Sequence, residues 1–168
     1  MIGTDMQRSA RFSEDGTLRY TLERVWDLSK SLVMFCLLNP SKADAERDDA
    51  TVRKCMGFAE RWGYGGILVG NVSPYRATDP RELVKAWKRG VNVFPDENGP
   101  FLTGLAKRSD VVVCGWGAAP IAQGQRAAIA SLLGPYNLRC LKTTNDGAPY
   151  HPLYLPYTSE LKPWPVTA

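Results

Sequence analysis

The sequence predicts an α/β fold: a three-layer α/β/α sandwich with a mainly parallel central sheet and an N-terminal β-hairpin. Two patterns carry this prediction, namely an alternating N-terminal segment and four later apolar runs separated by segments with helical spacing. Hydrophobic residues make up 44% of the 168 residues and charged residues 23%, which is typical of a folded globular protein. We therefore expect one domain spanning residues 1–168.

The N-terminal hairpin is predicted from residues 10–26. Apolar and polar residues alternate along this segment, as they do in a strand with one buried face. Residues 13–16 read Ser-Glu-Asp-Gly, which is a suitable sequence for the tight turn of a hairpin.

Four continuous apolar runs have the length of strands that are covered on both faces. They are residues 31–38, 67–72, 110–117 and 138–142. Between them, hydrophobic residues recur at helical spacing in four segments, which are residues 51–62, 81–88, 98–107 and 120–133. Asp48 or Asp49 is placed to cap the first of these helices. Strands that alternate with helices predict a mainly parallel sheet covered by helices.

Composition and motifs exclude several classes of protein. No run approaches the roughly 18 apolar residues that cross a bilayer, and no secretory signal is evident, so we expect a cytoplasmic protein without a membrane partner. The four cysteines form no Cys-x-x-Cys pair and the chain has one histidine, so we expect reduced thiols, no metal site and no cofactor. Walker, dinucleotide-binding and Gly-x-Ser-x-Gly motifs are missing from the sequence. The net charge of +4 permits a phosphate-bearing partner.

Polar residues stand where the predicted strands end. Asn39 follows the first apolar run, Asn71 ends the second and His151 follows the fourth. Because ligands of parallel sheets bind outside the carboxyl ends of the strands, we expect these three side chains to line one crevice. Each has a structural alternative, since Asn39 can form a capped turn, Asn71 can bond the turn that follows it, and a single histidine can be structural.

Further polar residues lie near this predicted crevice. Ser41, Ser73, Tyr75 and Arg76 have donors suited to phosphate contacts, and the alternative is a solvated loop. Asp48 and Asp49 are candidates for a general base if they do not only cap the helix. Trp116 is a candidate for stacking on a ligand, although a tryptophan more commonly packs in a core.

The motifs resemble an uncharacterised family of bacterial and phage domains. The resemblance rests on Leu-Asn-Pro-Ser at residues 38–41, His-Pro-Leu-Tyr-Leu at residues 151–155 and the segments between them, so it covers nearly the whole chain. A more distant resemblance is to the uracil-DNA glycosylase superfamily, closest to its mismatch uracil/thymine branch. The Asn-Pro at residue 39, Asn71 and the His-Pro at residue 151 stand in the order of that superfamily's active-site loop, base-reading Asn and His-Pro loop. In this chain Leu38 and Ser41 replace the glycines that flank the Asn-Pro.

This resemblance implies a DNA glycosylase that hydrolyses the N-glycosidic bond of uracil or a modified pyrimidine in DNA. Asn71 would read the flipped base, Asn39 would orient water and His151 would serve the leaving base. Leu153 or Tyr154 would fill the gap in the duplex. The base would stack on an aromatic residue, for which the candidates are Phe58, Trp62 and Tyr75.

The implied partner is DNA containing a non-standard pyrimidine, with no obligate protein partner. Two other functions remain open on the sequence. One is an enzyme of free nucleosides or nucleotides, which needs a closed pocket, and the other is a non-catalytic nucleic-acid-binding module, which needs only a basic face.

Overall fold

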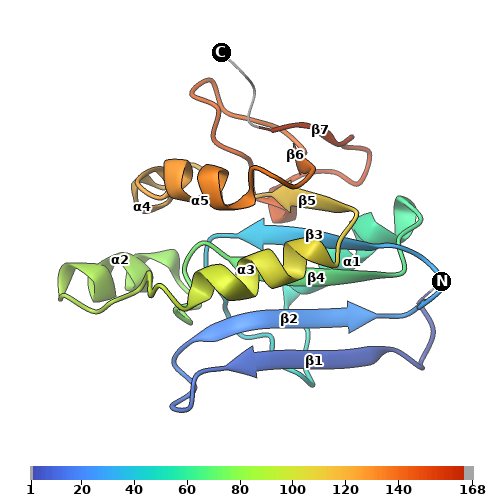
Figure 1. Ribbon diagram of the computed structural model, residues 1–168, viewed down its shortest axis with the longest axis horizontal. Helices are drawn as coiled ribbons and strands as arrows, with labels where there is room; N and C mark the ends of the chain where they lie inside the picture. Colours follow the sequence, from blue (N-terminus) through green and yellow to red (C-terminus); the bar gives the residue numbers. More distant parts are fainter. Residues whose placement is uncertain (1, 165–168) are drawn as a thin grey trace.

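The computed structural model describes residues 2–164, which form an α/β fold around one mixed sheet of seven strands in the order β1-β2-β4-β3-β5-β6-β7 (Figure 1). The strands are β1 (Gln7–Phe12), β2 (Arg19–Val25), β3 (Leu32–Leu37), β4 (Gly66–Asn71), β5 (Val111–Cys114), β6 (Leu138–Cys140) and β7 (Lys162–Pro163). The helices are α1 (Ala50–Arg61), α2 (Pro80–Lys88), α3 (Asn98–Lys107), α4 (Pro120–Gln123) and α5 (Arg126–Leu133), with a short 3-10 helix η1 (Pro152–Tyr154).

The sheet has a parallel centre and antiparallel edges. Strands β4, β3, β5 and β6 are parallel, while β1 and β2 form the predicted hairpin, β2 joins β4 antiparallel, and β7 joins β6 antiparallel. Within residues 2–164, three of the six pairings are therefore parallel and three are antiparallel. The prediction of a mainly parallel sheet describes only the central strands, because periodicity identifies a hairpin but not the strand that it extends.

Helices pack against both faces of the central strands. Met34 and Cys36 of β3 belong to a core cluster with residues of α2, α3 and α5, whereas Val33 and Phe35 belong to a second cluster with residues of α1. Successive side chains of a strand point to opposite faces, so these two clusters lie on opposite sides of the sheet. Figure 1 accordingly shows α3 in front of the central strands and α1 behind them.

Most predicted helices are present with boundaries shifted by about one residue, but residues 120–133 form two helices and not one. Helix α4 ends at Gln123 and α5 begins at Arg126. Gly124 lies at the break, and a glycine in a helix interior loses more conformational entropy than other residues. The capping prediction is confirmed for Asp49, whose side chain accepts a hydrogen bond from the backbone N–H of Val52.

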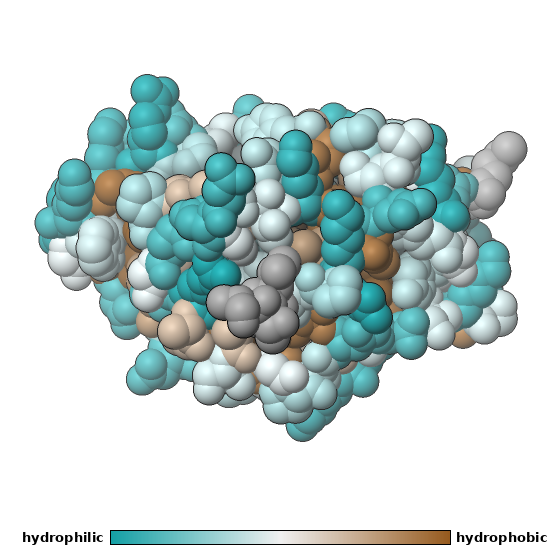
Figure 2. Space-filling model, turned by 90° about the horizontal axis from the view of Figure 1, so that it is seen from above, coloured by the Kyte–Doolittle hydropathy of each residue, from teal (hydrophilic) through white to brown (hydrophobic). Residues whose placement is uncertain are grey.

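The cysteines are unpaired and lie in the interior. All four cysteines are free and buried, and burial raises the pKa of the Cys36 thiol to about 12. Within residues 2–164, no helix combines the length and the apolar character needed to cross a membrane. Hydrophilic residues predominate on the face shown in Figure 2, where the hydrophobic patches are small and separated.

The connection from β4 to β5 crosses over β3, which creates a switch point at the carboxyl ends of β3 and β5. Open α/β sheets bind their ligands at such points. Gly115 follows β5 there, and a Cβ atom at this residue would lie 2.9 Å from Cδ of Pro152. The loop that carries His151 therefore packs directly against the end of β5.

Candidate functional site

Three cavities adjoin at this switch point. The inner cavity, about 40 Å³, is lined by residues that include Arg19, Asn39, Asp49, Asn71 and His151. The outer crevice, about 420 Å³, is lined by residues that include Asn39, Asp49, Trp116, His151 and Tyr154. The basic groove, about 660 Å³, is lined by residues that include Lys42, Arg47, Asp49, Arg53 and Arg76. Ser41 and Asp49 line all three, so the cavities form one continuous site.

The predicted convergence of Asn39, Asn71 and His151 is confirmed, because all three line the inner cavity. They come from the loop after β3, the end of β4 and the residue before η1. A volume of 40 Å³ accommodates a few water molecules at most and no aromatic ring. A ring-sized ligand therefore has to occupy the outer crevice, and only one edge of it can reach the inner cavity.

Asn39 joins two loops of the site. Its Nδ2 donates to the carbonyl oxygens of Ala77 at 2.9 Å and Pro40 at 3.1 Å, with a longer contact of 3.4 Å to the carbonyl of Tyr75. These bonds connect the loop after β3 to the loop after β4. Among the described residues none donates to Oδ1 of Asn39, which leaves this oxygen as an acceptor at the cavity wall.

An Asn39→Asp variant tests this loop-joining role. The change replaces the N–H donors with an oxygen while keeping an acceptor at the Oδ1 position, so the loop carbonyls lose their partner. We expect the free energy of unfolding to fall by about 1–3 kcal/mol, measured by urea denaturation. The control is Asn137→Asp, because Asn137 is exposed and its Oδ1 only accepts from Arg139. Equal stability of the two variants would contradict the role.

Asn71 is buried at the end of β4 with its amide at the cavity. Its backbone oxygen accepts from Nδ2 of Asn98 at 2.9 Å, and its Oδ1 accepts from Nη2 of Arg19 at the long distance of 3.5 Å. No residue between 2 and 164 accepts a hydrogen bond from its Nδ2. Asn71 thus presents an unused donor to whatever enters the cavity.

His151 is neutral and has a fixed tautomer. Its Nδ1 accepts a hydrogen bond from the backbone N–H of Leu153 at 3.2 Å, so the ring proton is on Nε2. Burial lowers the pKa of His151 to about 4, opposed by the negative charge of Asp49. At neutral pH the residue is therefore a neutral N–H donor in the cavity wall.

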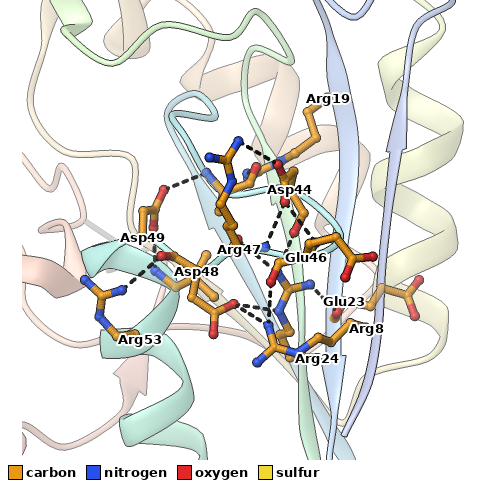
Figure 3. A network of polar contacts seen from close by, with 12 residues as sticks. Arg8, Arg19, Glu23, Arg24, Asp44, Glu46, Arg47, Asp48, Asp49 and Arg53 are labelled. Atoms are coloured by element: carbon orange, nitrogen blue, oxygen red, sulfur yellow. Dashed lines mark hydrogen bonds and ion pairs between the residues drawn. The ribbon is translucent and has the colours of Figure 1, made fainter.

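Asp49 and Asp48, the two candidates for a general base, have different surroundings. Asp49 caps α1 through Oδ1, and its Oδ2 accepts from the backbone of Ala43 at 3.3 Å, while the residue also lines all three cavities. Oδ1 of Asp48 is bound by Nε of Arg24 at 2.7 Å and by Arg8 at 3.1 Å (Figure 3). Asp49 is the carboxylate of the site, and Asp48 has a structural role.

Arg19 is a residue of the site that the sequence did not reveal. In a regularly alternating strand it is expected on the solvent side, on the face opposite Arg24. The pairing of β2 with β1 shifts register between Thr21 and Arg19, and both arginines bond the loop of residues 43–49. Arg19 donates to the carbonyl of Ala43 at 2.9 Å, and Arg24 extends from the same strand to Asp48 (Figure 3). Both arginines are consequently interior, and Arg19 is only 3% exposed.

Two of the residues predicted to contact phosphates, Ser73 and Tyr75, lie away from the cavities. Ser73 is buried and lines none of the three cavities, because its hydroxyl donates to the carbonyl of Val93 and accepts from the backbone of Tyr75. Tyr75 packs against the core cluster of α2 and α3, also away from the cavities. Arg76 and Ser41 do line the basic groove, although the Arg76 guanidinium also lies over the ring of Phe12 at 4.8 Å.

The aromatic residues divide between core and site. Phe58 of α1 and Trp62 at its end stack on each other, with ring centroids 5.1 Å apart, in the core between the helix and the sheet. Neither they nor Tyr75 can therefore stack on a ligand in the outer crevice. Trp116 lines the crevice but packs edge-on against Trp164 at 4.9 Å. Leu153 and Tyr154 line its rim, and Tyr154 is 79% exposed.

The fold and its cavities define an α/β domain with a ligand-sized site, lined by both polar and apolar side chains, at the carboxyl ends of its parallel strands. The chain belongs to the family described as "Protein of unknown function (DUF1643)", which it matches over residues 19–153. The matched segment includes Arg19, Asn39, Asp49, Asn71 and His151. No curated protein and no solved structure matches the chain.

Proposed function

We propose that this protein is a glycosylase-like hydrolase that cleaves the N-glycosidic bond of uracil or a modified pyrimidine in DNA. The observation that carries the proposal is the inner cavity, where Asn39, Asn71 and the neutral His151 lie together. A departing pyrimidine gathers negative charge on its carbonyl oxygens, and preorganised N–H donors stabilise that charge. The resemblance to the uracil-DNA glycosylase superfamily supports the same assignment, as does the packing of helices against both faces of the central strands.

In this mechanism the flipped nucleotide occupies the outer crevice with one edge of its base toward the inner cavity. The bond between C1′ and the base nitrogen breaks, and its electron pair leaves with the base. Nε2–H of His151 donates a hydrogen bond to a carbonyl oxygen of the base and keeps its proton. A water held by Oδ1 of Asn39 adds its oxygen to C1′ and loses one proton, while the base takes up one proton from solvent.

Asp49 has two tasks in this reaction. Its carboxylate lines the outer crevice, where it stabilises the positive charge that develops on the sugar as the base leaves. It also accepts the proton that the attacking water loses and returns it to solvent. Both carboxylate oxygens also accept backbone N–H bonds, and a brief proton acceptor suffices when bond cleavage runs ahead of water attack.

Nucleic acid is favoured over a free nucleoside by the surroundings of the crevice. Lys42, Arg47, Arg53 and Arg76 line the adjoining basic groove, where phosphates on either side of a flipped nucleotide can bind. The exposed Tyr154 at the rim has the position needed to fill the gap in a duplex. A site for free nucleosides would be a closed pocket without such a groove.

The direct test is base release. Single- and double-stranded oligonucleotides carrying uracil, mismatched thymine or 5-modified pyrimidines are incubated with the protein, and released bases are identified by mass spectrometry. We expect a free base and an abasic site from at least one substrate, with no release by an Asn71→Ala, His151→Ala double variant. Cleavage of nucleosides alone would establish an enzyme of free nucleosides, and binding without any release would establish a non-catalytic module.

We expect DNA binding to weaken as salt rises, because phosphate contacts release counterions. In a plot of log affinity against log salt concentration, Lys42→Ala and Arg76→Ala should each reduce the slope by about one, measured by fluorescence anisotropy. Lys107→Ala is the control, because Lys107 is an exposed cation of α3 that lines none of the three cavities. Binding that does not change with salt would contradict a role for the groove.

A further inference from the structure

Arg19 has too few partners for a buried guanidinium. It carries five N–H donors and is 3% exposed, yet its Nη1 has one good hydrogen bond, its Nη2 has one long contact of 3.5 Å, and its buried Nε has no partner within residues 2–164. Leaving such donors unpaired is costly, and native proteins rarely do so without a reason. Arg19 lines the inner cavity, so a ligand that enters it can supply the missing acceptor.

The cavity also limits what that acceptor can be. Asp49 lines the same small space and offsets the positive charge of Arg19, as does the carbonyl oxygen of Ala43 that Arg19 binds. A carboxylate in the cavity would be repelled by Asp49. A neutral carbonyl oxygen avoids the full charge of a carboxylate, and the N–H donors of Arg19 and Asn71 stabilise the partial negative charge that it acquires during cleavage.

We propose that Nε or Nη2 of Arg19 and Nδ2 of Asn71 together bind one carbonyl oxygen of the pyrimidine, which makes Arg19 a catalytic residue that contacts the departing base. This inference rests on the proposed function and adds a second donor site on the base to that of His151. It assigns selection of the base to a residue of β2, the strand that comes before the parallel strands in the chain. The oxygen concerned is the one at C4, so uracil is selected over cytosine, whose amino group at C4 would direct hydrogens at two donors.

The first test observes Arg19 in the wild-type protein. Arginine Nε–H signals are recorded by ¹⁵N–¹H NMR while uracil, cytosine, deoxyuridine monophosphate or acetate is added in turn. We expect uracil and the deoxyuridine nucleotide to shift the Arg19 signal, and acetate and cytosine to leave it unchanged. Arg24 is the internal control, because its Nε is already bound to Asp48 at 2.7 Å and should not respond. The proposal would be overturned if no base or nucleotide shifted the Arg19 signal, or if acetate were the only addition that shifted it.

The second test separates function from folding. Arg19→Met removes the unpaired donors but keeps a long buried side chain, so we expect single-turnover base release to fall by about 10²–10³-fold. The melting temperature should be unchanged or higher, because a buried group without a full set of partners has been replaced by an apolar one. Arg24→Met is the matched control, since Arg24 is fully bonded and its loss should lower the melting temperature. A structural Arg19 would give the opposite result, a lower melting temperature with unchanged release.

The two tests distinguish this inference from the proposed function. If the wild-type protein releases no base but uracil shifts the Arg19 signal, the carbonyl site stands and the glycosylase assignment fails. If the wild-type protein releases base and Arg19→Met does so at the same rate, the glycosylase assignment stands and the role of Arg19 fails.

Discussion

An Asn71→Ala variant is expected to release no base from any substrate that the wild-type protein cleaves. The change removes the Nδ2 donor from the inner cavity and takes the Oδ1 acceptor away from Arg19. Each buried polar group left unpaired costs about 1–3 kcal/mol, so the substrate should bind about tenfold to a hundredfold more weakly in addition to losing turnover. Single-turnover rates and equilibrium binding to the same oligonucleotide measure the two effects separately.

Ser73→Ala is the matched control for Asn71→Ala. Ser73 is two residues further along the chain and equally buried, but it lines none of the three cavities. We expect this variant to lose some stability, because Val93 loses the hydroxyl that its carbonyl accepts from, and to keep the wild-type rate of base release. Full release by Asn71→Ala would show that Asn71 does not read the base, whatever the rate of the control.

His151 should leave a clear signature in the pH dependence of both activity and stability. Since its pKa is about 4, the rate of base release is expected to stay flat between pH 8 and pH 5 and to change only near pH 4. His151→Gln should release base more slowly while binding DNA as the wild type does, because the contact strengthens as the base leaves. An inflection near pH 6.5 that this variant abolishes would contradict a neutral histidine.

The same pKa determines how stability responds to acid. The ordinary pKa of histidine is 6.5, so between pH 6.5 and pH 4 the unfolded chain takes up a proton that the folded protein does not. The stabilising contribution is therefore complete above about pH 6.5 and is lost as the pH falls toward 4, by up to about 3 kcal/mol. His151 is the single histidine of the chain, so urea denaturation of His151→Gln should lack this part of the pH dependence.

The central strands and the meeting of Asn39, Asn71 and His151 could be predicted from the sequence because they follow from local patterns. A continuous apolar run identifies a buried strand, and the residue after it lies at the carboxyl edge of the sheet. No knowledge of which strands are neighbours is needed, since all parallel strands end at that edge.

Other features depend on contacts between distant segments and could not be predicted in this way. Arg19 alternates with apolar neighbours as a solvent-facing residue does, but the register shift beside it and the loop of residues 43–49 make it interior. Ser73 stands in a loop between a strand and a helix, where a phosphate contact is plausible, but its hydroxyl is bound to Val93. For both residues, the sequence shows which hydrogen-bonding groups the side chain carries, but not the distant residue that they bind.

The antiparallel attachment of β2 to β4 has a consequence for folding. The two residues that meet where these strands adjoin, Arg19 and Asn71, are 52 positions apart, and the loop of His151 comes from the far end of the chain. Contacts of such large sequence separation form late, because closing a long loop costs entropy before the contact is made. The hairpin and the His151 loop must therefore both be docked before the binding surface exists, so a partly folded intermediate would not bind substrate.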